Sequence, residues 1–111
     1  MKNEAETTAF HLHLLSKIMN MEAYPFTKLI IECDITEQEY NELIRLLDYL
    51  DEQFKRQTEE GLLDFSSLLI HFAGMLHEKL ELHQTIFALK EEGYYPSLMN
   101  AFLAIIEHIK D

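Results

Sequence analysis

The sequence feature that most restricts the fold is the stretch of residues 65–110, in which apolar residues recur every three or four positions almost throughout. This spacing places them on one face of an α-helix. The whole chain has only three glycines and two prolines, and so few turn-forming residues disfavour a turn-rich β-sandwich. We therefore predict an all-α fold, an irregular bundle of about five helices, in a single domain of residues 1–111.

The first two predicted helices meet at a proline. Residues 4–21 place five apolar side chains on one side of a helix: Phe10, Leu14, Leu15, Ile18 and Met21. Pro25 marks a hinge, because proline disfavours helix at the preceding residue and is accommodated in the first turn of a new helix. Residues 26–33 are expected to form a short helix with Leu29, Ile30 and Cys33 inward. Their adjacent isoleucines also suit a strand, but the sequence offers no second strand to pair with it.

The third predicted helix, residues 36–60, has the clearest boundaries. Thr36 and Glu39 have the spacing of a capping box, in which each side chain accepts a hydrogen bond from the backbone N–H of the other. Gly61 supplies the left-handed residue that ends a helix. The apolar residues form a single stripe of Tyr40, Leu43, Leu46, Leu47, Leu50 and Phe54.

Three more helical segments follow. Asp64 is placed to cap a helix that begins at Phe65. An unbroken continuation would bury Lys79 without a partner, which is costly, so we expect a break within residues 79–84. A helix from about residue 84 to 92 then has Ile86, Phe87 and Leu89 inward and ends at Gly93. Pro96 begins the last helix at its first position.

The first and last predicted helices carry more apolar surface than a small bundle covers. The last helix is apolar around more than half of its circumference, and the arc of the first is also wide. We therefore predict a homo-oligomer that associates through these two helices. The alternative is a monomeric bundle with the last helix at its centre.

The formal net charge is −11. Nucleic acids and anionic membranes both require basic surface, so we predict neither as a partner. The acidic residues serve solubility or, alternatively, a docking surface for a basic protein. There is no secretory signal and no apolar run near the ~20 residues that cross a bilayer. The one cysteine, Cys33, suits a reducing compartment, and we expect a soluble cytoplasmic protein.

Carboxylates and histidines suggest two kinds of metal site. His77 and Glu81 lie at i and i+4 on a helix, but two ligands are too few, and a solvated polar pair is the simpler interpretation. The pairs Glu39/Glu42 and Glu78/Glu81 have the E-x-x-E spacing with which helical nucleotide pyrophosphatases hold magnesium. However, the pairs are distant in sequence, and Glu39 is already used by the capping box. We predict no catalytic, cofactor or metal-binding residues.

Nucleophilic catalysis is also disfavoured. Cys33 lies between Glu32 and Asp34, which raise the pKa of a thiol and suppress its thiolate. The tyrosines Tyr24, Tyr94 and Tyr95 flank the two prolines. Such residues usually fix a helix junction, and the alternative is an exposed anchor for a partner.

The chain resembles the YhaI-like family of small uncharacterised bacterial proteins. The resemblance rests on Tyr24-Pro25-Phe26 with Leu29-Ile30, Gly61 and Asp64-Phe65 with Leu68-Leu69, Phe72-Ala73-Gly74, Glu78-Lys79-Leu80, residues 85–89, Gly93, Tyr95, Leu98-Met99 and Phe102. It implies an all-helical bacterial cytoplasmic protein and carries over no catalytic or binding residues. His77 departs from the family pattern, which weakens a metal role for it.

Two functions from different classes remain. The first is a homo-oligomeric protein-interaction or regulatory module, indicated by the apolar surplus and by the lack of a catalytic constellation. The second is a magnesium-dependent hydrolase of a nucleotide or another phosphorylated small molecule, indicated only by the paired glutamates. We favour the first, and so do not expect an enzyme.

Overall fold

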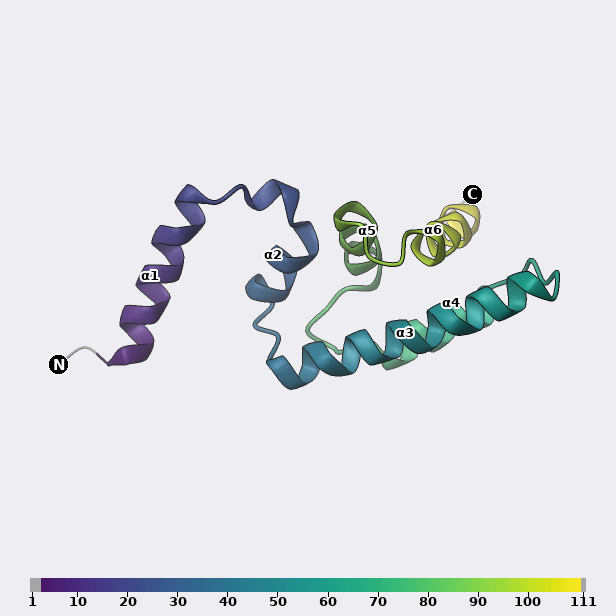
Figure 1. The fold of residues 1–111 in the computed structure, drawn as a ribbon, viewed down its shortest axis with the longest axis horizontal. Coiled ribbons are helices and arrows are strands. Elements are labelled where there is room, and N and C mark those ends of the chain that lie inside the picture. The colour runs from purple at the N-terminus through teal and green to yellow at the C-terminus, as the bar shows by residue number, and fades with distance from the viewer. Residues whose placement is uncertain (1–2, 111) are drawn as a thin grey trace.

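The computed structural model describes residues 3–110, and this part of the chain is helical without any β-strand (Figure 1). Its elements are α1 (Glu4–Ile18), the 3₁₀ helix η1 (Met21–Ala23), α2 (Pro25–Glu32), α3 (Glu37–Glu59), α4 (Ser66–Met75), α5 (Leu82–Glu92) and α6 (Pro96–Lys110). The predicted all-α fold is confirmed, with six α-helices among the described residues where we expected about five.

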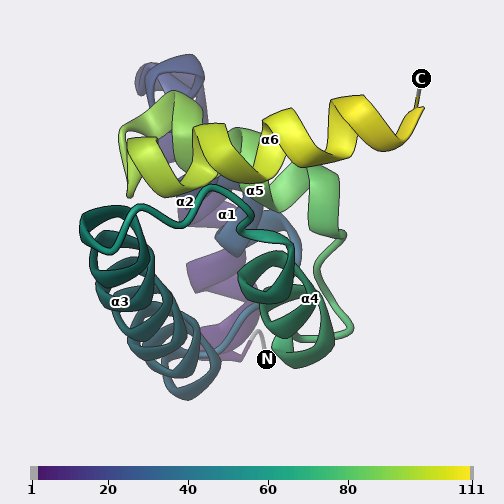
Figure 2. The same ribbon diagram turned by 90° about the vertical axis from the view of Figure 1, so that its right-hand side faces the viewer.

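Helices α2 to α6 pack together, whereas α1 projects from one end (Figure 1). Helices α3 and α4 lie side by side as a hairpin, and α6 crosses above them (Figure 2). Helix α5 lies between α2 and α6 and packs on both of them. The molecule is elongated, with extents of 61 × 24 × 24 Å.

The core lies between α3, α4 and the layer formed by α2, α5 and α6. The phenyl rings of Phe72 and Phe102 stack at its centre with their centroids 5.8 Å apart. The buried apolar side chains are Phe26, Leu29, Leu43, Leu47, Leu50, Leu68, Leu69, Phe72, Leu80, Ile86, Ala88, Leu89, Leu98, Met99, Phe102 and Leu103. The one buried polar side chain among the described residues is Thr85, whose hydroxyl donates to the carbonyl of Glu81 at 2.6 Å.

The helix boundaries marked by the two prolines, by the capping box and by the glycines after α3 and α5 are confirmed, whereas α4 begins at Ser66, one residue after the predicted start at Phe65. Pro25 and Pro96 each begin a helix. The capping box is complete, with the Glu39 N–H donating to the Thr36 hydroxyl at 3.1 Å and the Thr36 N–H donating to the Glu39 carboxylate at 2.9 Å. Gly61 and Gly93 follow α3 and α5 at φ values of +82° and +91°, a left-handed conformation that glycine adopts without steric cost.

Residues 26–33 form a helix, and the strand alternative is wrong. Helix α2 buries Leu29 as expected. It also buries Phe26 completely, against the ring of Tyr94 at a centroid distance of 5.2 Å. Phe26 is not among the residues that the sequence predicts to face inward, and it lies in the first turn of α2, next to Pro25.

Three predicted details are wrong, and a fourth, the position of the break after α4, is right only in part, because the break covers residues 76–81. The first helix ends at Ile18, since the chain turns into η1 before Met21. The break after α4 begins at Leu76, earlier than residues 79–84, because the connection turns towards α3. Helix α5 begins at Leu82, since the Glu81 carboxylate caps it by accepting from the N–H groups of residues 83 and 84. Phe87, expected inward, is 51% exposed.

The apolar surplus is concentrated in α1 and not in α6. The first half of α6 is enclosed, with Leu98, Met99, Phe102 and Leu103 all buried, while Ile109 near its end is exposed. Helix α1 buries none of its residues. Whether the chain oligomerises through either helix stays a prediction.

Candidate functional site

Helix α1 presents an apolar surface that no other described element covers. We call four of its side chains the α1 apolar face: Phe10, Leu14, Leu15 and Ile18, which are 58%, 40%, 46% and 81% exposed. Part of this face is a shallow groove that also includes His11 and Lys17. Large apolar side chains gathered on one helix without cover are the usual mark of an interaction surface.

The two ends of α1 explain why these residues form a helix there. The Asn3 side chain accepts a hydrogen bond from the Glu6 N–H at 2.7 Å, which satisfies a free amide of the first turn. Glu4 and Glu6 lie in that first turn and Lys17 lies in the last, where their charges oppose those of the helix dipole. These local interactions favour a helix at this position, and the α1 apolar face remains uncovered.

The connection between α1 and α2 is held by its own backbone hydrogen bonds. The N–H of Ala23 donates to the carbonyl of Asn20, and the N–H of Tyr24 donates to the carbonyl of Met21, at 3.3 and 3.2 Å. The resulting turn, η1, packs on α2. Helix α1 leaves the rest of the molecule from this turn (Figure 1).

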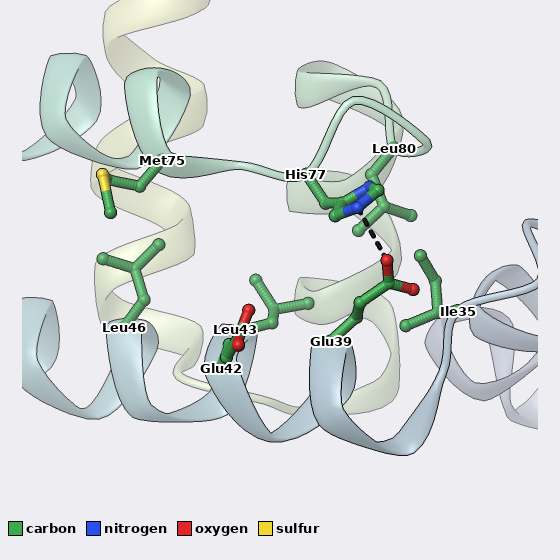
Figure 3. Close-up of a pocket in the computed structure, with 8 residues that line it drawn as sticks. All are labelled: Ile35, Glu39, Glu42, Leu43, Leu46, Met75, His77 and Leu80. Atoms are coloured by element: carbon green, nitrogen blue, oxygen red, sulfur yellow. Dashed lines mark ion pairs between the residues drawn. The ribbon is translucent and has the colours of Figure 1, made fainter.

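A second candidate surface lies where α3 faces the end of α4 and the connection to α5 (Figure 3). We call it the Glu39 groove, and it is lined by Ile35, Glu39, Glu42, Leu43, Leu46, Met75, His77 and Leu80. Its volume of about 230 Å³ exceeds the roughly 30 Å³ that a water molecule occupies. The groove is wide enough for side chains of a partner, and apolar residues make up most of its lining.

Glu39 is the centre of a polar cluster at one end of this groove. Its carboxylate lies 2.7 Å from Nε2 of His77 and 2.9 Å from Nζ of Lys79 (Figure 3 shows the first pair). Lys79 also donates to the backbone carbonyl of Asp34 at 3.0 Å. These contacts tie the connection between α4 and α5 to the start of α3.

The hydrogen bonds of His77 define its tautomer. Its Nδ1 accepts from the backbone N–H of Lys79 at 3.1 Å, so the ring proton resides on Nε2, which donates to Glu39. The backbone N–H of Thr36, and next the ammonium of Lys79, hold the pKa of Glu39 at about 2, below its ordinary value of 4.5. The same hydrogen bond from Lys79 to Glu39 raises the pKa of the lysine.

The structure does not bring the two glutamate pairs together as a metal site. Glu39 contacts His77 and Lys79, and the carboxylate of Glu81 caps α5. The expected pairing of His77 with Glu81 is wrong, because the helix ends before His77 and the imidazole turns to Glu39. Within residues 3–110 no three histidine, cysteine or acidic side chains are grouped so that they could hold a metal ion.

Sequence reasoning missed the partnership of Glu39, His77 and Lys79. The one signal was Lys79 itself, because a lysine within an apolar arc requires an anionic partner. That signal predicted a break in the helix, but it did not identify Glu39, which is 40 residues away in the sequence, as the partner of Lys79.

Two of the three tyrosines fix helix junctions, as predicted. Tyr94 packs on Phe26, and the hydroxyl of Tyr95 donates a hydrogen bond to Asp48 on α3. Burial, followed by this hydrogen bond, raises the pKa of Tyr95. Tyr24 is 54% exposed beside η1. Cys33 is a half-buried free thiol.

The fold and these surfaces define a class of small helical protein whose first helix stands apart from the packed body. Residues 1–107 match the family described as Protein of unknown function (DUF1878), so the chain belongs to that family. The match supports the broader part of the resemblance, an uncharacterised domain family, and the YhaI-like identification stays an expectation. Among the described residues, no helix combines the length and apolarity needed to span a bilayer.

Proposed function

We propose that this protein is a protein-interaction module that associates with further copies of itself through α1. The observation that carries the proposal is the α1 apolar face, whose four large side chains are 40–81% exposed. A helix with such a face normally buries it against another element. Within the chain the described elements leave it open, and a second copy is a partner that is always present at the same concentration.

The distribution of charge supports self-association through this segment. Lys2 and Lys17 balance Glu4 and Glu6, so residues 1–19 are neutral in a chain of net charge −11. Two acidic bodies repel one another, and contact through a neutral apolar helix reduces that repulsion. A reducing compartment such as the bacterial cytoplasm would suit the free thiol of Cys33.

The test is the mass of the protein in solution. Light scattering coupled to gel filtration should give a multiple of the monomer mass at micromolar concentration, and Leu14→Glu with Ile18→Glu should return the monomer. The matched control is Ile70→Glu, on α4, where the side chain is 71% exposed. A monomer mass for the unaltered chain at every concentration would refute the proposal.

The magnesium-dependent hydrolase is the competing hypothesis. It requires carboxylates that converge on an ion, whereas Glu39 contacts His77 and Lys79, and Glu81 caps α5. Calorimetric titration with magnesium separates the two hypotheses. A saturable heat that Glu78→Gln abolishes would favour the hydrolase.

A further inference from the structure

The Glu39 groove has the chemistry to receive an apolar helix. Leu43 and Leu46 project from α3 towards the end of α4, and Met75 faces them from above (Figure 3). Met75 is 65% exposed, so the groove has an apolar rim as well as an apolar floor. Burial of that rim by a docked helix is favourable.

The charge at the groove complements that of α1. Residues 8–18 of α1 contain no acid and include Lys17 with two histidines. The groove has Glu39 and Glu42 on its edge. Glu39 is occupied by Lys79 and His77, but the hydrogen-bond partner of Glu42 is the uncharged amide of Gln38, at 3.2 Å. Glu42 therefore keeps an uncompensated negative charge at the rim, where Lys17 of a docking helix supplies a cation.

The geometry of the connection points to the groove of another copy. Helix α1 projects away from the body to which it belongs (Figure 1), and it leaves that body at η1, which packs on α2. Each copy thus has one α1 and one Glu39 groove. When two copies exchange α1 reciprocally, both interfaces are identical and the assembly is closed, which is the commonest symmetry of soluble oligomers.

We infer that α1 of one copy docks in the Glu39 groove of a second copy, with the α1 apolar face on Leu43, Leu46 and Met75 and with Lys17 beside Glu42. This inference rests on the proposed self-association and adds the identity of the receiving surface. The smallest closed assembly is a two-fold dimer.

A second groove competes for the same helix. It lies between the connection after α3 and the end of α6, where Leu63, Phe65, Ile105 and Ile109 line it together with Asp64 and His108. The carboxylate of Asp64 accepts a hydrogen bond from the Ser66 N–H at 2.9 Å. In this groove the Asp64 carboxylate is accompanied by His108, whereas the hydrogen-bond partner of Glu42 in the Glu39 groove is an uncharged amide, so the second groove is a poorer match for Lys17.

Charge reversal in two separate proteins tests the docking. Lys17→Glu and Glu42→Lys each place like charges at both interfaces of a dimer, and each should weaken association by roughly tenfold. An equimolar mixture of the two variants restores an opposite-charge pair at both interfaces. The mixture should therefore associate about as tightly as the unaltered protein, measured by sedimentation equilibrium.

Disulfide trapping locates the groove independently. In a Cys33→Ser background, one protein carries Ile18→Cys and the other carries Met75→Cys. Oxidation of the mixture should give a crosslinked heterodimer, and replacement of the second protein by one with Ile109→Cys should not. Ile18, Met75 and Ile109 are all well exposed (81%, 65% and 74%), so these variants should fold, and circular dichroism checks this.

The outcomes distinguish a failure of the proposed self-association from a failure of the proposed receiving groove. If Glu42→Lys leaves association unchanged while Ile18→Ala weakens it, the receiving surface is wrong and the self-association stands; pairing of α1 with α1 gives this result. Failure of the charge-reversal mixture to recover association, absence of the heterodimer between the Ile18→Cys and Met75→Cys proteins, or preferential crosslinking at Ile109→Cys overturns the inference. A monomer under all conditions refutes the proposed function and the inference together.

Discussion

The replacement of Ile18 by alanine gives the sharpest quantitative test, because this residue is the most exposed member of the α1 apolar face, at 81%. The substitution removes three carbon atoms beyond Cβ. At about 0.8 kcal/mol for each buried CH₂ group, covering the exposed part of this side chain contributes about 2 kcal/mol per copy. A two-fold dimer contains two such sites, so the loss is about 4 kcal/mol and the dissociation constant rises by several hundred-fold to a thousand-fold.

The assay is a dilution series followed by sedimentation velocity. Alanine has the highest helix propensity, so the substitution does not itself weaken α1, and the packed body keeps its stability in urea at low concentration. Ile70→Ala is the control, since it removes the same three carbon atoms from a side chain that is 71% exposed on α4, outside α1 and both grooves. A change in the dissociation constant of less than about threefold corresponds to about 0.6 kcal/mol. So small a change would refute the reasoning that burial of Ile18 drives association.

Four further predictions concern the body of the molecule, each measured by urea unfolding of a monomeric α1 variant unless stated otherwise. Phe72→Ala removes a fully buried ring that stacks on Phe102 and should cost about 3–5 kcal/mol; a loss of under 1 kcal/mol would contradict the described core. Gly93→Ala should destabilise by about 1–2 kcal/mol because φ is +91°. By contrast, Gly74→Ala should stabilise by roughly 0.5–1 kcal/mol, since Gly74 is within α4 and an added Cβ would meet no atom within 4 Å. The pKa of Glu39 is about 2 in the folded chain, against an ordinary value of 4.5. Its ionised form therefore contributes stability above pH 4.5, and this stability is lost as the pH falls towards 2. In an acid titration followed by circular dichroism, Glu39→Gln should not show this loss of stability.

The parts of the fold that local chemistry determines were predictable from the sequence. The capping box at Thr36 and Glu39, the glycines at the ends of α3 and α5, and the prolines that begin α2 and α6 each act within one helical turn. Such signals depend on backbone hydrogen bonds and allowed dihedral angles, which need no knowledge of the tertiary arrangement. The apolar spacing of residues 65–110 in the same way fixes the fold class.

The parts that depend on contacts between distant residues were not predictable. Lys79 required an anion, but nothing near it in the sequence identifies Glu39 as that anion. Phe87 lies among apolar residues and still faces solvent, because the neighbouring α2 and α6 cover only part of α5. The candidate surfaces were foreseen only in part. The first helix was expected to be uncovered, whereas the Glu39 groove exists only because the chain turns at Leu76 and returns over α3.

The isolation of α1 has a consequence for how its secondary structure forms. A lone helix of 15 residues is only marginally stable in water, because the first turn is costly to nucleate and most helical stability in proteins comes from packing. If the chain self-associates through α1 as proposed, ordering of this helix is coupled to its burial, and we expect the fraction of chains with a formed α1 to rise with protein concentration. The far-ultraviolet ellipticity per residue should then increase in magnitude with protein concentration. In a dilute solution the packed body would carry a partly unfolded α1, and in a concentrated solution α1 would be fully helical.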